Sequence, residues 1–151
     1  MGNPNLPPSN EAAVAAVIDP DVTVASTVTS GWVSMATFRT VMAVVLAGTL
    51  GTSATVDAKL EQATDAAGTG VKDVTGKSIT QLTQAGTDSD KQSVINCMQS
   101  DLDVANDFDH VRLSITVGVA TSDVGGVVMG LAPAYGFASE NDSTTVAEIV
   151  T

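Results

Sequence analysis

The chain has 151 residues, of which 44% are hydrophobic and only 15% are charged. This length suits one domain with a substantial core and is too short for two comfortable domains. The net charge of −11 disfavours direct contact with nucleic acid or an anionic membrane surface, since both are negatively charged. The single cysteine, Cys97, excludes an internal disulfide and a multi-cysteine metal site, and its neighbours favour a small buried residue.

Residues 1–21 predict an extended N-terminal arm. Residues 1–10 contain three of the five prolines and show no hydrophobic periodicity. Residues 11–18 (EAAVAAVI) fit either one or two helical turns, ended by the proline at position 20, or an extended segment that lies across a partner. We expect this arm to become ordered on binding, and the core to begin at Val22.

Period-two alternation begins at Val22 and predicts strands over residues 22–29 and 32–37. Residues 38–47 are apolar on both faces, as expected of a strand in the middle of a sandwich. Residues 54–62 alternate between apolar and charged side chains. Because only a Gly/Thr/Ser turn separates these last two segments, a hairpin between them is the most natural local structure.

Further strands are predicted over residues 77–83 and 92–99, and a last one over residues 124–134. The clearest alternation in the chain covers residues 111–119. About eight short strands and no long helical pattern predict an all-β fold, a single β-sandwich or jelly-roll-like domain. Its core would span residues 22–138, followed by a polar, acidic C-terminal tail over residues 139–151 that is a flexible end or a short strand.

The stretch GVKDVTGKS, residues 70–78, ends like a nucleotide-binding P-loop. A P-loop needs four residues between its two glycines, whereas five separate Gly70 from Gly76. The residues that follow, Ile79 to Thr83, are poor helix formers, so no helix N-terminus would face a phosphate. We expect a turn between extended segments, with Gly76 in a conformation with positive φ.

The one histidine, His110, could form a triad with Ser114 and Asp107 only if their side chains converged. Nothing near it resembles a nucleophile elbow, and a lone histidine at a strand start is far more often a hydrogen-bonding residue at the surface. The sequence therefore predicts no catalytic residues and no enzymatic activity.

Four aspartates lie between Asp101 and Asp109, and carboxylates gathered in a loop are typical of calcium sites. The spacing is not that of an EF-hand, because Ala105, Asn106 and Arg112 occupy positions that need a ligand, a glycine and a glutamate. A looser calcium site and a solvated acidic loop both remain open. The sequence therefore predicts no specific metal ligand and no cofactor-binding residue.

The aromatic residues are few, and two of them, Tyr135 and Phe137, lie in an apolar strip at residues 130–137. This strip fits either the core or a contact surface. We expect it to belong to the core, because a sandwich with so few aromatics needs large side chains to fill it.

Several stretches carry a resemblance to a known class of protein: residues 31–36 (GWVSMA), 44–48 (VVLAG), 56–68 (VDAKLEQATDAAG), 71–76 (VKDVTG) and 108–113 (FDHVRL). Over roughly residues 31–137 the chain resembles small virion proteins of tailed bacteriophages. The resemblance implies a structural component, either a capsid decoration (cement) protein or a minor head–tail or tail protein, and it carries over no site residues.

A decoration protein would be located on the capsid exterior after assembly in the host cytoplasm. It would bind the major capsid protein, without contacting nucleic acid or membrane, and would form a homotrimer at local threefold positions. The acidic surface agrees with a protein kept away from packaged DNA. The alternative outside this class is a jelly roll that binds a glycan or host surface, with calcium on the loop at residues 101–109.

Overall fold

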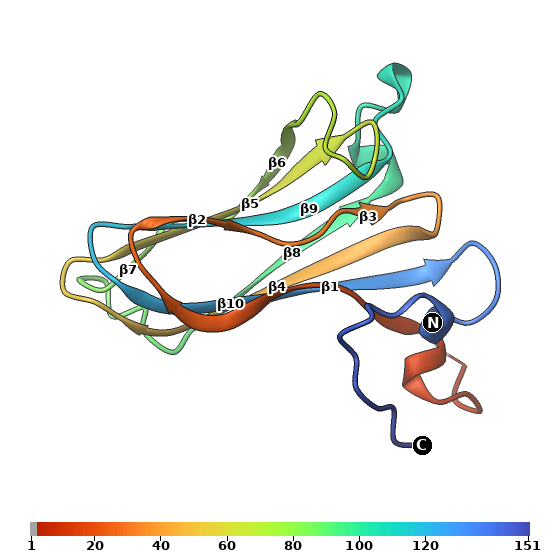
Figure 1. Ribbon diagram of the computed structural model, residues 1–151, viewed down its shortest axis with the longest axis horizontal. Helices are drawn as coiled ribbons and strands as arrows, with labels where there is room; N and C mark the ends of the chain where they lie inside the picture. Colours follow the sequence, from red (N-terminus) through yellow and green to blue (C-terminus); the bar gives the residue numbers. More distant parts are fainter. Residues whose placement is uncertain (1–2) are drawn as a thin grey trace.

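The computed structural model describes residues 3–151, which fold into two stacked antiparallel β-sheets. Figure 1 shows β2, β9 and β5 in one layer and β1, β10 and β4 in the other. The strands are β1 (Ala12–Thr23), β2 (Ser26–Thr29), β3 (Val33–Ser34), β4 (Phe38–Leu50), β5 (Thr55–Ala63), β6 (Lys72–Ser78), β7 (Leu82–Thr83), β8 (Gln92–Met98), β9 (His110–Gly118) and β10 (Ser122–Pro133). The short 3-10 helices are η1 (Pro8–Asn10), η2 (Gln99–Asp101), η3 (Val104–Asn106) and η4 (Ala138–Asn141).

The strand order is that of a jelly roll. Sheet A has the order β1-β10-β4-β8, and sheet B has the order β2-β9-β5-β6, with β3 added to β9 and β7 to β5. The first half of the chain therefore pairs with the second half in reverse order: β1 with β10, β2 with β9, β4 with β8, and β5 with β6. This nested pairing, wrapped into two sheets, defines the eight-stranded jelly roll. The expected all-β sandwich is confirmed.

The core lies between the sheets and is built from aliphatic side chains. Strand β9 confirms the clearest sequence pattern, since Val111, Leu113 and Ile115 have no exposed surface. From the facing sheet, Val45 is equally buried. Phe38 is the one aromatic side chain in this core among residues 3–151, and its ring lies against Gly130 of the neighbouring strand, where an added Cβ would come within 2.5 Å of it.

The folded core begins at Ala12, where β1 starts, and not at Val22 as predicted. The predicted arm is wrong for residues 12–21, which pair with β10 in sheet A and bury Ala13 and Ile18. A register shift between Val14 and Ala16 interrupts the alternation, and this interruption disguises the strand in the sequence. Residues 3–7, by contrast, lie outside every helix and strand.

The predicted strand over residues 22–29 is wrong at its first half. Val22 is the last residue but one of β1, and Val24 lies in the link through which the chain leaves sheet A for β2 in sheet B. Both side chains are about two-thirds exposed, at 65% and 64%. An alternating sequence can therefore continue across a point where the chain changes sheets.

The predicted hairpin between residues 38–47 and 54–62 is also wrong. Strand β4 pairs with β10 and β8 in sheet A, whereas β5 pairs with β9, β6 and β7 in sheet B. The short turn between them therefore crosses from one sheet to the other. The inward side chains of the two strands, including Val41 and Leu60, belong to the same buried cluster between the sheets.

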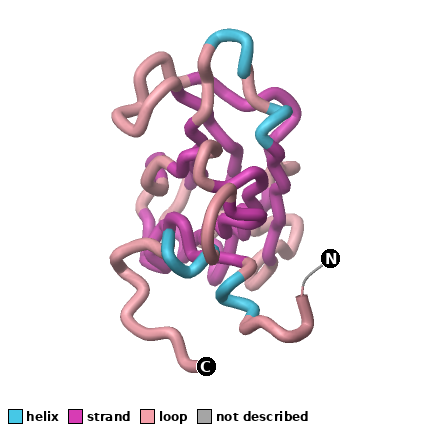
Figure 2. Tube along the Cα trace, turned by 90° about the vertical axis from the view of Figure 1, so that its right-hand side faces the viewer, coloured by secondary structure: helices cyan, strands magenta, loops and turns pink. Residues whose placement is uncertain are grey.

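The C-terminal segment is fixed to the free edge of β1, so the expectation of a flexible end is wrong for residues 139–143. Helix η4 packs against β1, and the backbone N–H of Val14 donates to Asp142 Oδ1 at 2.7 Å. The N–H of Ser143 donates to the carbonyl of Val14, also at 2.7 Å. Figure 2 shows both ends of the described chain at the same end of the molecule.

Candidate functional site

The stretch that ends in Gly-Lys-Ser contains the whole of strand β6, where we had expected a turn. Gly76 has a φ of 75°, as expected of a glycine-dependent position, but it lies within the strand. Lys77 forms an ion pair with Asp101 at 2.9 Å, so its ammonium group is already neutralised. The N–H groups of an extended strand do not converge on one phosphate, so residues 72–78 do not have the geometry of a P-loop.

The acidic loop between β8 and β9 holds the carboxylates of Asp101, Asp103 and Asp109 in ion pairs or hydrogen bonds within the protein. Asp101 accepts a hydrogen bond from the N–H of Met98 and pairs with Lys77, and both contacts lower the pKa of its carboxyl. The Lys72 ammonium and the Asn106 amide lower the pKa of Asp103 in the same way.

The four aspartates of this loop do not converge on one point. Asp109 turns to the imidazole of His110, whose Nδ1 lies 2.6 Å from its Oδ1. Within residues 3–151, no group of three or more histidine, cysteine, aspartate or glutamate side chains is arranged to hold a metal ion. The geometry therefore favours the interpretation of a solvated acidic loop over that of a calcium site.

His110 opens strand β9 and shares a sheet face with Ser114, but the two are four residues apart in an extended strand. At about 3.3 Å per residue their Cα atoms are roughly 13 Å apart, too far for a proton transfer between the side chains. Ser114 is on the outer face of sheet B but is covered there by neighbouring residues, with 2% exposure. The structure does not bring these residues together as a triad.

The apolar strip near the end of the domain is not core, contrary to our expectation. Strand β10 ends at Pro133, and the following turn carries Tyr135 outward, where its side chain is 90% exposed. Phe137 is about half exposed. Gly136 lies between them with a φ of 66°, in the left-handed region that turns the chain here.

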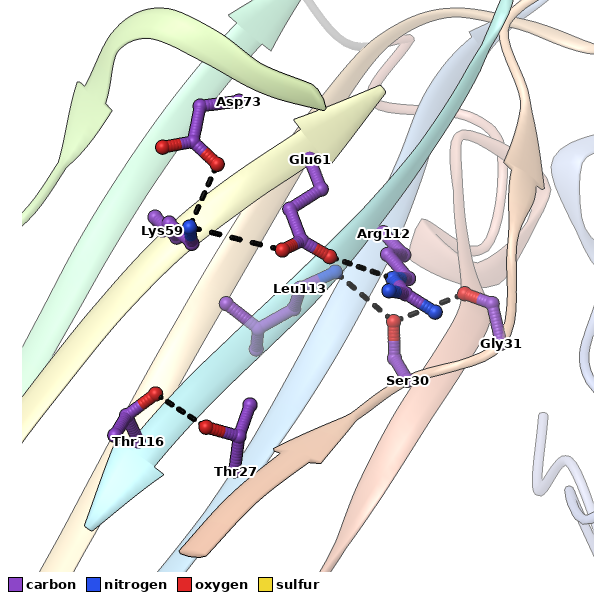
Figure 3. A network of polar contacts seen from close by, with 9 residues as sticks. All are labelled: Thr27, Ser30, Gly31, Lys59, Glu61, Asp73, Arg112, Leu113 and Thr116. Carbon is purple, nitrogen blue, oxygen red and sulfur yellow. Dashed lines mark hydrogen bonds and ion pairs between the residues drawn. The ribbon is translucent and has the colours of Figure 1, made fainter. Parts of the chain in front are cut away.

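A network of polar contacts covers the outer face of sheet B, and sequence reasoning did not find it. Figure 3 shows Arg112 on β9 joined to Glu61 of the neighbouring strand β5. Arg112 Nε donates to Glu61 Oε2 at 2.8 Å, and its guanidinium lies 4.6 Å from the centre of the Trp32 ring. Lys59 joins Glu61 at 3.7 Å, extending the network along β5.

These contacts are structural in character, because each charge is matched by a neighbour on the sheet. Glu61 and Arg112 are directly opposite in the register of β5 and β9. The opposite charges are readable in the sequence, but their pairing depends on which strands are neighbours. Trp32 is occupied by Arg112, which leaves less of its ring for stacking against a sugar.

The outer face of sheet A differs from this polar surface, because its outward side chains are mostly aliphatic. The sequence indicates this apolar outer face, because residues 38–47 are apolar on both faces. We interpreted that pattern as a fully buried strand, whereas β4 buries one face and turns Met42, Val44 and Leu46 outward. At one end of this face is a hollow of about 560 Å³ lined in part by Asp21, Asp90 and Asp123.

Cys97 points into the core from β8 and is 1% exposed, as expected from its neighbours. Burial raises the pKa of its thiol to about 11, so the group stays protonated and unreactive at neutral pH. Within residues 3–151, no helix is long and apolar enough to cross a bilayer.

Comparisons with known proteins give a fold-level likeness only. No family model matches the chain, and no curated protein matches its sequence. A solved structure of broad bean stain virus has 14% identity and a TM-score of 0.44, and the match covers 99% of this chain and 97% of that one. Structures of infectious bursal disease virus, strains Gx and Gt, have 13% and 12% identity and TM-scores of 0.43 and 0.44.

The matches to infectious bursal disease virus cover 84% and 91% of this chain, which spans only 33% and 37% of the viral chains. Because all three TM-scores are below 0.5, the assignment of the fold rests on the strand order and not on these neighbours. Nothing about the partners of those proteins is carried over to this chain.

Proposed function

We propose that this chain is a non-enzymatic structural protein of a virus particle, and specifically a decoration protein on the outside of a tailed-phage capsid. In this role it binds the major capsid protein and stabilises contacts between capsomers. The observation that carries the proposal is the jelly-roll strand order, an architecture found in viral capsid domains, lectins and cupins. Fold alone does not fix function, so the other features must choose among these classes.

The arrangement of side chains and the net charge favour the virion role over that of a cupin. Cupin-type chemistry uses a cluster of metal ligands, and no such cluster occurs within residues 3–151. The resemblance of residues 31–137 to small virion proteins of tailed phages supports the choice. The net charge of −11 suits a position on the outside of the shell, since a protein facing packaged DNA would need the opposite sign.

In the proposed particle, the copies group as trimers at local threefold positions. Many weak contacts repeated over a lattice give tight overall attachment, so no single contact needs to be strong. A minor connector or tail protein of the same virion is the alternative within this class, and it would differ in having few copies arranged as a ring.

Binding to shells tests the proposal. Shells assembled from the major capsid protein of the same genome would be mixed with the purified chain and sedimented. We expect the chain to co-sediment and to saturate at one copy, or a simple fraction of one, per capsid subunit. A chain that stays in the supernatant at all concentrations, or that saturates at a handful of copies per shell, contradicts the decoration role.

A second candidate is a glycan-binding or host-surface-binding module. Tyr135 is 90% exposed, and Phe137, two residues later, is about half exposed, so this turn offers aromatic surface to a sugar. A ligand that binds the folded state raises the unfolding temperature. Glycans that raise it for the native chain but not for Tyr135→Ala would favour this candidate.

A further inference from the structure

The outer face of sheet A is largely apolar across all four strands, and its acidic side chains, Asp19, Asp21, Asp90 and Asp123, gather at one end. We call the apolar part the sheet-A face. At its centre, Val17, Val127, Val44 and Val94 stand opposite one another on β1, β10, β4 and β8. Their neighbours along each strand point into the core, so these four valines point outward. Val94, on the edge strand, is 54% exposed.

The rows beside the valines continue the same chemistry. One row holds Val14, Met129, Met42 and Asn96, and the next ends at Met98, which is 54% exposed. Three of the five methionines of the chain therefore lie on this face. Methionine side chains are flexible and polarisable, and they are common on surfaces that adapt to a partner.

Charged residues are absent from the four rows that span Thr40 to Leu46 of β4 and their paired positions, all within the described part of the chain. The last of these rows contains Gly125, Leu46 and Gln92, and Leu46 is 41% exposed. The C-terminal segment reaches the face only on the β1 side, where Thr145 lines a hollow together with Val17 and Val127. The β8 side remains open.

The chemistry of the face selects its partner. A basic or acidic partner would be met by charged side chains, and the paired positions of the four rows hold none, so the surface that matches them is itself apolar and uncharged. The same face on another copy of the chain fulfils this requirement. With these faces together, the charges of two strongly acidic chains stay at the rim or further away, which minimises their mutual repulsion.

The size of the face predicts a weak contact. With strands about 4.8 Å apart and about 3.3 Å per residue, four strands over seven residues give a projected area of roughly 440 Å² per copy. A stable pair of proteins buries about 800 Å² per partner. Association through this face is therefore concentration-dependent for free chains and is strengthened where many copies are held close together.

We propose that copies of this chain associate through the sheet-A face, apolar surface against apolar surface. Two copies can stack face to face as sheets do in a sandwich, and three can turn their faces toward a common axis. The inference names the surface used by the trimer in the proposed function. Its test uses the purified chain without shells, so it can fail or succeed independently of the capsid role.

The test is sedimentation velocity of the native chain and of Val94→Lys and Leu46→Lys over a wide range of concentration. Both sites are about half exposed, so a lysine can be solvated in the free chain. We expect the native chain to reach the mass of two or three copies at high concentration, and each variant to need at least tenfold more protein. Each lysine also makes the chain less acidic, which by itself would favour association.

The matched control is Thr29→Lys, which adds the same charge at an exposed strand position of sheet B. We expect this control to associate like the native chain. A native chain that is monomeric at every concentration overturns the proposal. So does an oligomer that the two sheet-A variants leave unchanged, or one that Thr29→Lys weakens equally.

Methionine oxidation provides a second measurement on the native chain, which is useful if a variant fails to fold. Dilute peroxide should oxidise Met98 at low protein concentration, and at least several-fold more slowly at high concentration, where the face is covered. Met35 is 1% exposed in the core and serves as an internal reference. Oxidation of Met98 that is independent of protein concentration contradicts association through this face.

Discussion

At the scale of single residues, the contact between Gly130 and Phe38 shows how closely the two central strands of sheet A approach. A Cβ at position 130 would lie 2.5 Å from two ring carbons, and the ring is held by the core on its other side. We expect Gly130→Ala to lower the free energy of unfolding by about 1–3 kcal/mol, since overpacking forces side chains or backbone to shift. Urea unfolding measures this loss.

The control for this substitution is Gly31→Ala, because no atom lies within 4 Å of a Cβ added at Gly31. A change within about 0.5 kcal/mol is expected there. If the two substitutions had equal effects, Phe38 would not be packed against Gly130 as described.

Cys97 provides a residue-level test of burial. Its thiol is 1% exposed and its pKa is raised to about 11 by burial. We expect a thiol reagent at pH 8 to react with the native chain only at the rate of unfolding, and to react at once in denaturant. Immediate reaction without denaturant would place Cys97 outside the core.

Individual contacts were the least predictable part of the structure. The burial of Cys97 followed from its neighbours in sequence, and the absence of a phosphate loop followed from glycine spacing. The stacking of Arg112 on Trp32 could not be predicted, because it depends on β3 and β9 being neighbours. The exposure of Tyr135 likewise depends on where β10 ends and not on the hydrophobicity of the residue.

At the scale of elements, β1 is an integral strand of sheet A. It pairs with β10 over most of its length and buries Ala13, Ala16 and Ile18. We expect removal of residues 1–21 to expose the edge of β10 and to abolish cooperative thermal unfolding. Removal of residues 1–7 should change the unfolding temperature by no more than a few degrees, because residues 3–7 include no buried side chain. A folded domain after the longer deletion would contradict the pairing of β1.

Elements with regular alternation were predicted well, and their partners were not. Strands β8, β9 and β10 match the predicted segments within a few residues, because alternate apolar side chains of each strand point into the core. Period-two patterns do not say whether two successive strands pair in one sheet or face each other across the core. This ambiguity accounts for the wrong hairpin between β4 and β5, which lie in different sheets.

At the scale of the whole molecule, the ion pairs of the loops link stability to pH. The Lys72 ammonium lowers the pKa of Asp103, and the Lys91 ammonium lowers that of Asp88, relative to the usual 3.8. A carboxylate with a depressed pKa stabilises the fold above its unfolded pKa, and this contribution is lost as the pH falls through the folded pKa. We expect stability to decline below about pH 4.

Asp103→Asn should reduce stability at pH 7 and flatten the acid decline, as measured by urea unfolding at a series of pH values. The matched variant in the same loop is Asp107→Asn, which changes the same charge at a residue that forms no salt bridge within residues 3–151. Equal effects of the two substitutions would mean that the pair with Lys72 does not contribute. At the alkaline end, the unfolded chain loses the Cys97 proton first, so stability should also fall between pH 9 and about 11.

The whole molecule is a jelly roll with a charged, hydrogen-bonded sheet on one side and an apolar sheet face on the other. In the proposed assembly, the polar side would face solvent and neighbouring copies would cover the apolar side. If the proposed capsid role is right, a lattice would repeat this weak contact many times and so strengthen the attachment.

The measurement that tests the capsid role most directly is the copy number of this chain in a purified phage particle. Quantitative mass spectrometry would compare it with the major capsid protein of the same particle. A decoration protein is expected at a ratio near one, or near one-third where one copy serves each local threefold group. A handful of copies per particle would contradict the decoration role, and absence from the particle would contradict any structural role in the virion.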